Sequence, residues 1–334
     1  MYTAIWGEIK GAPTESLIFY FQMNKFPKEK IRVLTEAIQK HIYYDEVVQA
    51  LKDAYEEHFA GLMTKRVFNN TLETHRKTFG PRLRKHAFTD DTVLSIATME
   101  VMLLMAAKGS YSIVGADTIF AEKYRDWARK YPAAGFGGQF RVWFKGSNQK
   151  PYYSMANGSA MRTGPLAYLP LELFDILQMA RTASAVTHNH PEGIRGALAV
   201  THAAYTALHQ TKSKSIIKGN VEEHYYYDLS RTLADIRPKY KFEVLAQNSV
   251  PEAIISFWES TSAISAVENA ISLGGDTDTQ AMIAGSIADA FYGYESIPAH
   301  VKVLVHAALP NEMLDIFHAF NEKFVPSHKA VATE

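Results

Sequence analysis

The sequence predicts a single all-α domain, and three observations predict it. Apolar residues recur at three- and four-residue steps through most of the chain, strand-like alternation is scarce, and no linker rich in Gly, Ser or Pro divides the 334 residues. Apolar residues spaced in this way form one stripe of an amphipathic helix. With 47% hydrophobic residues the chain can bury a sizeable core. We therefore expect one compact helical domain over residues 1–325 and a disordered polar tail over 326–334.

The expected helices follow this spacing and the positions of capping residues and proline. Apolar periodicity predicts helices over Ile31–Ile42 and Val47–Leu62. Proline is accepted at a helix start, where its missing N–H would have no partner in any case. Further helices are therefore expected after Thr89, Pro170, Pro191, Pro251, Asp278 and Pro298. Strand character is suggested only by the aromatic run Tyr225–Tyr227.

Composition excludes several kinds of function. The 35 basic and 35 acidic residues balance, so no overall field favours nucleic acid or an anionic membrane, and we expect neither as a partner. The absence of cysteine rules out a disulfide framework, a thiolate metal site and a cysteine nucleophile. No apolar run approaches the length of a membrane span, and the N-terminus lacks the pattern of a signal peptide. We expect a cytoplasmic protein.

Paired carboxylates stand at two of the expected helix starts, in the stretches FTDDT and GGDTDT. A single such residue is an ordinary N-cap, but adjacent buried carboxylates repel one another unless a cation neutralises them. The sequence spacing leaves open whether the two stretches meet. If they meet, their carboxylates and hydroxyls form a hard-oxygen set that favours Mg²⁺, Mn²⁺ or Ca²⁺ over Zn²⁺. The residues that carry these oxygens are Thr89, Asp90, Asp91, Asp276, Asp278 and Thr279.

The stretch ANGSAMR, between the two acidic stretches, contains a turn at Asn157, Gly158 and Ser159. Such a turn exposes backbone amides that can cradle a phosphate, with Arg162 as a further donor. The alternative is an ordinary loop before a helix, with Arg162 in a salt bridge.

The stretch VTHNHPEG brings His188 and His190 close to Gly193. A buried histidine is most often a satisfied core residue, and the HxH spacing also allows a metal pair. Because hard-oxygen ligands dominate elsewhere, we favour substrate hydrogen bonding as the functional interpretation of these two histidines.

In this order the motifs resemble those of the ADP-ribosylglycohydrolase family, which includes ADP-ribosyl-arginine hydrolases. The resemblance runs through GEIKGAPTE, FTDDT, RKYPAAGFGGQFRVWF, ANGSAMR, VTHNHPEG, SVPEAIISFWEST and GGDTDT. It implies a compact orthogonal helical bundle with two Mg²⁺ or Mn²⁺ ions at the floor of a cleft. The implied metal ligands are the six oxygen-bearing residues of FTDDT and GGDTDT named above.

The resemblance also implies further roles. Glu15 would be a catalytic carboxylate beside the ions, together with Asp90, Asp91 and Asp278. The diphosphate and the ribose would be held by the NGS turn. The ADP-ribose pocket would be lined by residues of the VTHNHPEG stretch. The implied substrate-binding residues are Asn157, Gly158, Ser159, His188, His190 and Gly193.

The implied activity is metal-dependent hydrolysis of the glycosidic bond between ADP-ribose and a modified acceptor, with protein arginine as the expected acceptor. This reaction reverses mono-ADP-ribosylation and passes through an oxocarbenium-like transition state, so the enzyme must hold the ribose and deliver water. The alternatives are hydrolysis of another ADP-ribose conjugate, or an immunity protein that neutralises an ADP-ribosyltransferase toxin. We expect a helical insertion over residues 16–80, which would either cover one side of the bundle or form a lid or partner-binding element. In the immunity protein, this insertion would contact the toxin.

Three residues depart from the family's pattern: Glu8 stands in place of Asp, Ala156 in place of Gly, and Met155 in place of an aromatic residue. The first could displace a water near the ions, and the second restricts the backbone of the turn. Stacking on an adenine would come instead from Tyr152, Tyr153 or Phe144. None of the implied metal ligands is lost, and we expect an active hydrolase.

Overall fold

The computed structural model describes residues 1–23, 44–53, 55, 65–78, 88–147 and 150–326. Within these residues the chain is helical and contains no strand; its single β-bridge joins Ala156 to Leu245. The all-α prediction is confirmed. The helices are α1 (Tyr2–Met23), α3 (Tyr44–Asp53), α5 (Lys65–Thr78), α7 (Asp90–Ala107), α8 (Ala116–Lys130), α9 (Gly138–Lys145), η1 (Asn157–Ser159), α10 (Ala160–Thr163), η2 (Gly164–Tyr168), α11 (Leu173–Ala185), α12 (Pro191–Tyr205), η3 (Thr206–Gln210), α13 (Lys214–Tyr225), α14 (Leu233–Ile236), α15 (Ala246–Trp258), α16 (Ala263–Ser272), α17 (Thr277–Tyr292), η4 (Tyr294–Ser296), α18 (Ala299–Ala308) and α19 (Asn311–Phe324).

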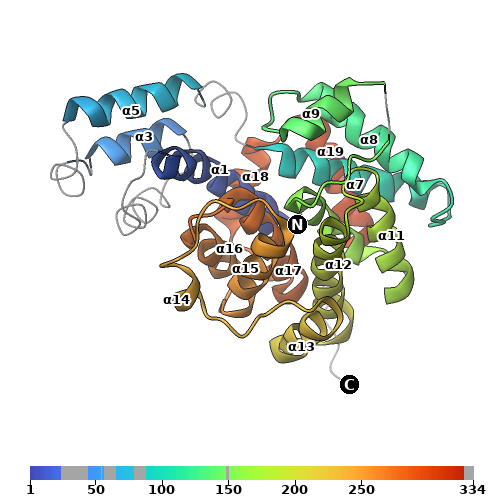
Figure 1. Ribbon diagram of the computed structural model, residues 1–334. Coiled ribbons are helices and arrows are strands. Elements are labelled where there is room, and N and C mark those ends of the chain that lie inside the picture. Colours follow the sequence, from blue (N-terminus) through green and yellow to red (C-terminus); the bar gives the residue numbers. More distant parts are fainter. Residues whose placement is uncertain (24–43, 54, 56–64, 79–87, 148–149, 327–334) are drawn as a thin grey trace.

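Helices α7 and α17 form the centre of the bundle, with the other long helices packed around them (Figure 1). Both are apolar or small on nearly every side, and most of their residues are buried. A helix without a polar face avoids water, whereas α8, α9 and α19 each carry one apolar stripe. The two acidic motifs therefore lie at the starts of two helices that are mostly buried.

Helix α1 packs along α17 at very short range, and glycines make this possible. A Cβ at Gly11 would lie 2.7 Å from the Cα of Asp278, and a Cβ at Gly285 would lie 2.6 Å from the Cα of Ala4. Only residues without a side chain fit at such backbone contacts. The first motif of the chain is thereby held against the start of α17, more than 260 positions away in the sequence.

The individual helix predictions have mixed outcomes. Helices begin at Asp90, Pro191 and Ala299, close to the predicted starts. The prediction of a helix start at Pro251 is wrong, because α15 begins at Ala246 and continues through the proline. A helix can contain proline at the cost of one backbone hydrogen bond, so this residue did not mark a boundary.

The aromatic run Tyr225–Tyr227 is not a strand. Tyr225 is the last residue of α13, and Tyr226 follows it in the left-handed conformation, with φ of 55°, as the C-cap. A left-handed residue is a common way to end a helix, and here it leaves the ring of Tyr226 exposed.

Part of the predicted insertion can be described. Helix α1 continues to Met23, so the first residues of the range 16–80 extend the first helix of the bundle. Helices α3 and α5 lie beside the outer end of α1 (Figure 1). The predicted helix Ile31–Ile42, the later part of Val47–Leu62 and residues 327–334 fall outside the described residues. None of the described helices combines the length and apolar composition that a bilayer-spanning segment requires.

Candidate active site

The two acidic helix starts meet. The Oγ1 atom of Thr89 lies 3.2 Å from Oδ2 of Asp91 and 3.4 Å from Oδ2 of Asp278. The Oγ1 atom of Thr279 lies 3.4 Å from the same Oδ2 of Asp91, although these two residues are 188 positions apart. Oxygens of the FTDDT and GGDTDT motifs thus form one buried cluster, which the sequence spacing could not establish.

The backbone conformation of the GGDTDT motif directs its carboxylates toward this cluster. Gly274 adopts a left-handed conformation, with φ of 70°, which glycine reaches without strain. At Gly275 a Cβ would lie 2.4 Å from a ring carbon of Tyr240, so a side chain has no room there. The turn leads to Asp276, the N-cap of α17, and places Asp278 in the first turn. The two glycines explain why GG precedes the acidic residues.

The cluster holds more negative charge than the protein around it balances. Burial raises the pKa of the Asp91 carboxyl well above its ordinary value, and the charges of Asp278, Asp90, Glu8 and Asp276 raise it further. Oδ1 of Asp91 is buried and has no hydrogen-bond partner among the described residues. Within the same part of the chain, neither Asp91 nor Asp278 forms an ion pair with a Lys or Arg side chain. These features are typical of a site that receives a cation.

Glu8 caps helix α7 from outside. Its carboxylate accepts a hydrogen bond from the backbone N–H of Thr89 and another, at 3.0 Å, from the hydroxyl of Thr92. Burial raises the pKa of Glu8 to about 8. Thr89 is the N-cap residue of α7 but makes no capping bond with its own side chain. Glu8 thereby satisfies the backbone N–H of the N-cap residue, and the hydroxyl of Thr89 faces Asp91 and Asp278 instead of capping the helix.

The donor set fits a hard divalent cation. Neighbouring ligand oxygens around an octahedral Mg²⁺ lie about 3 Å apart, given bond lengths of about 2.1 Å. The oxygen separations of 3.2–3.4 Å in the cluster are close to this spacing. Among the residues that the structure describes, no three carboxylate or imidazole side chains form an ion site by themselves. A cation at this place would therefore also need the hydroxyls of Thr89 and Thr279 as donors.

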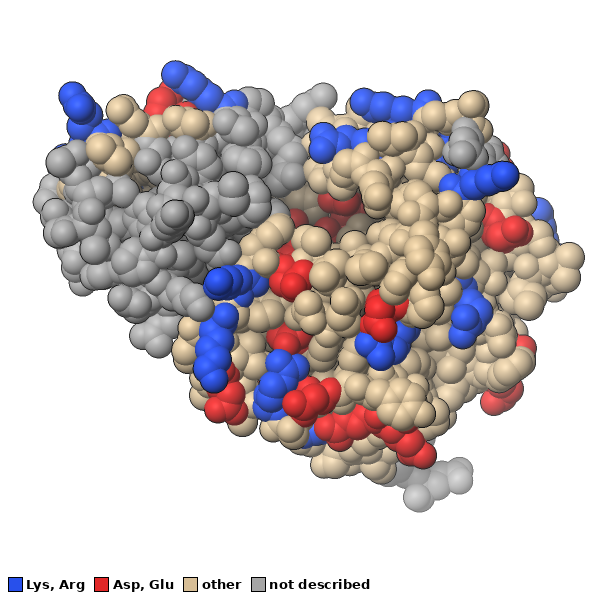
Figure 2. All heavy atoms as spheres, viewed as in Figure 1, with Lys and Arg blue, Asp and Glu red and all other residues tan. Residues whose placement is uncertain are grey.

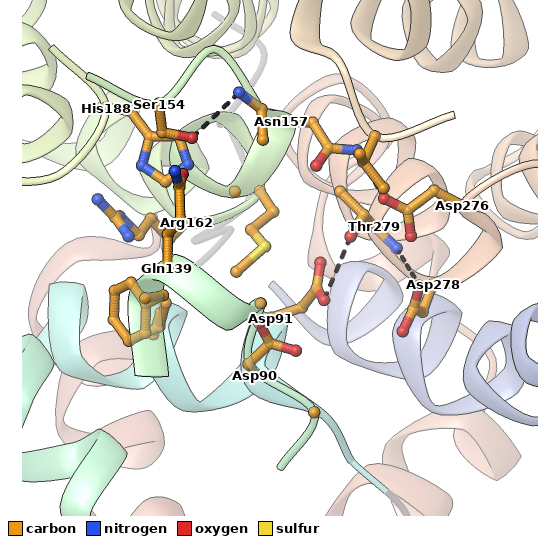
Figure 3. Close-up of a pocket in the computed structure, with 18 of the residues that line it drawn as sticks. Asp90, Asp91, Gln139, Ser154, Asn157, Arg162, His188, Asp276, Asp278 and Thr279 are labelled. Atoms are coloured by element: carbon orange, nitrogen blue, oxygen red, sulfur yellow. Dashed lines mark hydrogen bonds between the residues drawn. The ribbon is translucent and has the colours of Figure 1, made fainter. Parts of the chain in front are cut away.

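The cluster opens into a cavity of about 380 Å³, within the usual range for small-ligand sites. Figure 2 shows acidic atoms inside the corresponding hollow. We call one side the acidic wall, formed by Asp90, Asp91, Asp276, Asp278 and Thr279. We call the other the donor wall, formed by Gln139, Tyr152, Ser154, Arg162 and His188. Figure 3 shows Ser154, Arg162 and His188 on one side of the cavity and Asp276, Asp278 and Thr279 on the other.

Asn157 is hydrogen-bonded to the acidic wall. Its Nδ2 donates a 2.7 Å hydrogen bond to Oδ2 of Asp276, and its backbone N–H donates to the carbonyl of Val244. The side chain therefore orients a carboxylate of the acidic wall from the predicted phosphate turn. Gly158, the next residue, also lines the cavity, and a Cβ there would lie 3.2 Å from Nε2 of His188.

The donor wall is built on a fully buried arginine. Nη2 of Arg162 donates to the hydroxyl of Thr187 at 2.7 Å and to the carbonyl of Ala183 at 3.3 Å. The guanidinium lies over the ring of Tyr124, 4.1 Å from its centroid. The alternative that placed Arg162 in a salt bridge is wrong for the described residues, because no carboxylate there pairs with it. Burial lowers the pKa of His188 well below its ordinary value, and the charge of Arg162 lowers it further.

Three predicted binding residues support the cavity without lining it. The hydroxyl of Ser159 donates to the carbonyl of Gly193 at 2.8 Å, and a Cβ at Gly193 would lie 2.7 Å from the carbonyl of Ser154. Nδ1 of His190 accepts the N–H of Glu192 and caps α12. These contacts fix the turn at residues 154–159 against α12. Glu15 belongs to α1, but its side chain is outside the described part of the structure.

Part of the cavity lining is not among the residues predicted from the sequence. Gln139 and Phe140 enter the cavity from the start of α9, and Phe242 and Val244 enter from the segment before α15. The glycines of GFGGQF were a usable signal for the first pair, since they mark a tight turn; nothing in the sequence marked the second. Of the three residues expected to stack on an adenine, only Tyr152 lines the cavity, since Tyr153 is 60% exposed and Phe144 is buried in the core.

Comparison with known proteins agrees with this site. The family model described as ADP-ribosylglycohydrolase matches residues 4–327. The chain belongs to the ADP-ribosylglycohydrolase family. Both acidic motifs and the NGS turn fall within the matched range, so the family assignment covers the whole cavity. With relatives that are named as hydrolases, the chain is a glycohydrolase of this family.

The relatives are distant. ADP-ribosylhydrolase ARH3 of Homo sapiens is 28% identical over 269 residues, which cover 63% of this chain and 72% of that protein. The ADP-ribosyl-[dinitrogen reductase] glycohydrolase of Rhodospirillum rubrum is 26% identical over 250 residues, covering 71% of this chain and 81% of that protein. A solved structure titled ADP-ribosylglycohydrolase-related protein complex superposes with a TM-score of 0.53 at 20% identity, over 70% of this chain and 81% of that one. This last likeness supports the fold alone.

Proposed function

We propose that this glycohydrolase releases ADP-ribose from a modified protein side chain, with arginine as the first acceptor to test, and that it requires two Mg²⁺ or Mn²⁺ ions. The observation that carries the proposal is the convergence of two acidic helix starts opposite a buried arginine in one cavity. A dinucleotide-like ligand with an anionic diphosphate and ribose hydroxyls presents complementary groups to both walls. The macromolecular partner is then an ADP-ribosylated protein.

The acidic wall would hold the ions. Thr89, Asp90, Asp91, Asp276, Asp278 and Thr279 supply only hard oxygen donors, and the unpartnered Oδ1 of Asp91 is a further available ligand atom. Bound divalent cations would neutralise these carboxylates and orient the hydroxyls of a ribose. Asn157 keeps Asp276 in place through its 2.7 Å hydrogen bond, and Glu8 holds the start of α7.

The donor wall would bind the anionic part of the ligand. Arg162 brings a positive charge with no described counter-charge, and His188 and the backbone of the NGS turn add hydrogen-bond donors. Anchoring the ligand here would hold the scissile bond at the acidic wall. In the reaction, the bond from the anomeric carbon to the acceptor atom breaks, water gives its hydroxyl to that carbon, and a proton goes to the acceptor. Glu15 stays a candidate for the carboxylate that handles this proton.

The test is a release assay. Protein ADP-ribosylated on arginine, and in parallel on another side chain, is incubated with the enzyme in Mg²⁺, in Mn²⁺ and in excess EDTA, and free ADP-ribose is measured. We expect release from the arginine-modified protein with either ion and none with chelator. Full turnover in EDTA contradicts the metal requirement. If ADP-ribose is released only from the other substrate, the acceptor is that side chain and not arginine.

The toxin-neutralising alternative stays a prediction, because much of residues 16–80 lies outside the described structure. Deleting residues 20–75 distinguishes it from the hydrolase. A hydrolase keeps its turnover in that variant and loses it in Asp278→Ala, whereas a toxin-binding protein loses protection in the deletion variant and keeps it in Asp278→Ala.

A further inference from the structure

A chain of hydrogen bonds leads from the buried arginine to the cavity. Nη2 of Arg162 lies 2.7 Å from Oγ1 of Thr187, and the same Oγ1 lies 2.8 Å from Nδ1 of His188. All three side chains are buried. A guanidinium can only donate hydrogen bonds, so Oγ1 of Thr187 must accept from Arg162. The hydroxyl hydrogen of Thr187 is then available for the imidazole.

We propose that Arg162 and Thr187 are positioning residues that hold His188 as the neutral tautomer with the proton on Nε2, so that this N–H donates a hydrogen bond to an oxygen of ADP-ribose in the cavity. The proposal rests on the proposed function for the identity of the ligand. The tautomer itself is a property of the free protein.

Two physical arguments favour this tautomer. With the proton on Nδ1, the imidazole N–H would point along the chain toward the positive guanidinium, whereas a lone pair on Nδ1 is attracted to it. A hydroxyl that accepts from a guanidinium is also polarised into a stronger donor. The phenol of Tyr152 contacts Thr187 as well, and it can use the remaining lone pair of Oγ1. The burial and nearby positive charge that lower the pKa of His188 keep the ring neutral.

The other end of the imidazole reaches the ligand space. His188 lines the cavity, and Nε2 faces Gly158, where even a single methyl group would lie 3.2 Å away. Because position 158 has no side chain, a ligand oxygen can approach Nε2 beside the phosphate turn. A fixed N–H at this point selects an acceptor atom, and a lone pair there would select a donor.

The deciding experiment reads the tautomer directly. Two-bond ¹H–¹⁵N NMR correlations of histidine-labelled protein without ligand distinguish protonation at Nε2 from protonation at Nδ1. In wild type and in Thr187→Ser, which keeps the hydroxyl, we expect His188 to be protonated at Nε2. In Thr187→Val, which keeps the shape and loses the hydroxyl, we expect both tautomers. Protonation at Nδ1 in wild type, or the same single tautomer in Thr187→Val, overturns the proposal.

A second measurement connects the tautomer to binding. We expect Thr187→Val to weaken the affinity for free ADP-ribose about ten-fold and to raise KM with kcat within about two-fold, while Thr187→Ser stays near wild type. Thermal unfolding of all three proteins checks that the fold is intact. Unchanged affinity in a folded Thr187→Val contradicts the proposed hydrogen bond to the ligand. Absence of ADP-ribose binding in wild type instead contradicts the proposed function, and the NMR result still decides the tautomer.

Discussion

The acidic wall and the donor wall face one cavity but bury charges of opposite sign. On the acidic wall, buried carboxylates lie close together, and the pKa of Asp91 rises because its ionised form is disfavoured. On the donor wall, the buried guanidinium of Arg162 pairs with no described carboxylate, and the pKa of the neighbouring His188 falls. Joining the two charges would stabilise the free protein. Keeping them apart leaves each wall ready for a ligand of opposite charge, at a cost in stability.

The largest expected effect breaks the acidic wall. We expect Asp278→Asn to lower kcat/KM by about 10³-fold or more, because a neutral amide cannot replace a carboxylate that balances cations, a loss of several kcal/mol. The measurement is release of ADP-ribose from a modified protein. The matched control is Asp117→Asn, since Asp117 also stands in the first turn of a helix, α8, but is exposed outside this cavity. Equal loss in both variants would assign Asp278 a capping role only.

The next prediction concerns cation binding in the absence of substrate. At a Mg²⁺ concentration about 100 times its Kd, binding stabilises the folded state by about 2.7 kcal/mol, which raises Tm. We expect Asp91→Asn to unfold at a higher temperature than wild type in EDTA, since it removes one of the repelling charges, and to lose the rise with Mg²⁺. Differential scanning calorimetry checks both statements. Thr187→Val, which lies behind the donor wall in contact with Arg162 and His188, should keep the full Mg²⁺ response, and loss of this response would show that the walls are not independent.

A third variant moves the acidic wall without changing its chemistry. We expect Gly11→Ala to lower the free energy of unfolding by about 2 kcal/mol, because the new Cβ would press on the backbone of Asp278 at 2.7 Å. Turnover should fall by more than the fraction of unfolded protein explains. The control is Gly219→Ala in α13, where the Cβ meets nothing within 4 Å and we expect a gain of about 0.5–1 kcal/mol. Denaturant unfolding measures the free energy of unfolding of both variants. If Gly11→Ala and Gly219→Ala change it equally, the close approach of α1 to α17 is not the cause.

The last prediction is a pH dependence of the stability of the metal-free protein. Burial raises the pKa of Glu8 from the ordinary 4.5 to about 8. Between these values the folded state binds more protons than the unfolded state, so stability is retained at low pH and is lost as the pH rises through about 8. Urea unfolding at several pH values in EDTA measures this slope. Glu8→Gln should flatten it, and an unchanged slope in this variant would assign the dependence to other groups.

The features that can be predicted from the sequence are those that depend only on residues close together in the chain. The doubled aspartates of FTDDT and GGDTDT exceed what one helix cap needs, and that excess predicts a cation site from the sequence alone. Periodic apolar residues indicated the all-α fold for the same local reason. Helix starts are harder to predict. Pro251 lies inside α15, because a proline does not by itself mark the first residue of a helix.

The features that were not predictable depend on residues far apart in the chain. Glu8 looked like a departure from a motif, yet its partner Thr89 is 81 positions away, and only their contact identifies it as the cap of α7. For Arg162, both a phosphate donor and a salt bridge were open, and the surroundings of its side chain excluded the second.

By itself, the sequence determined the helical class through its periodicity and carried the motifs of the family, because both are local properties of the chain. The tertiary structure decided that the acidic starts of α7 and α17 share one cluster, that α1 approaches closely enough to support it, and that a buried arginine faces it across the cavity. Distances between segments arise from packing of the whole bundle, and no stretch of residues encodes them separately.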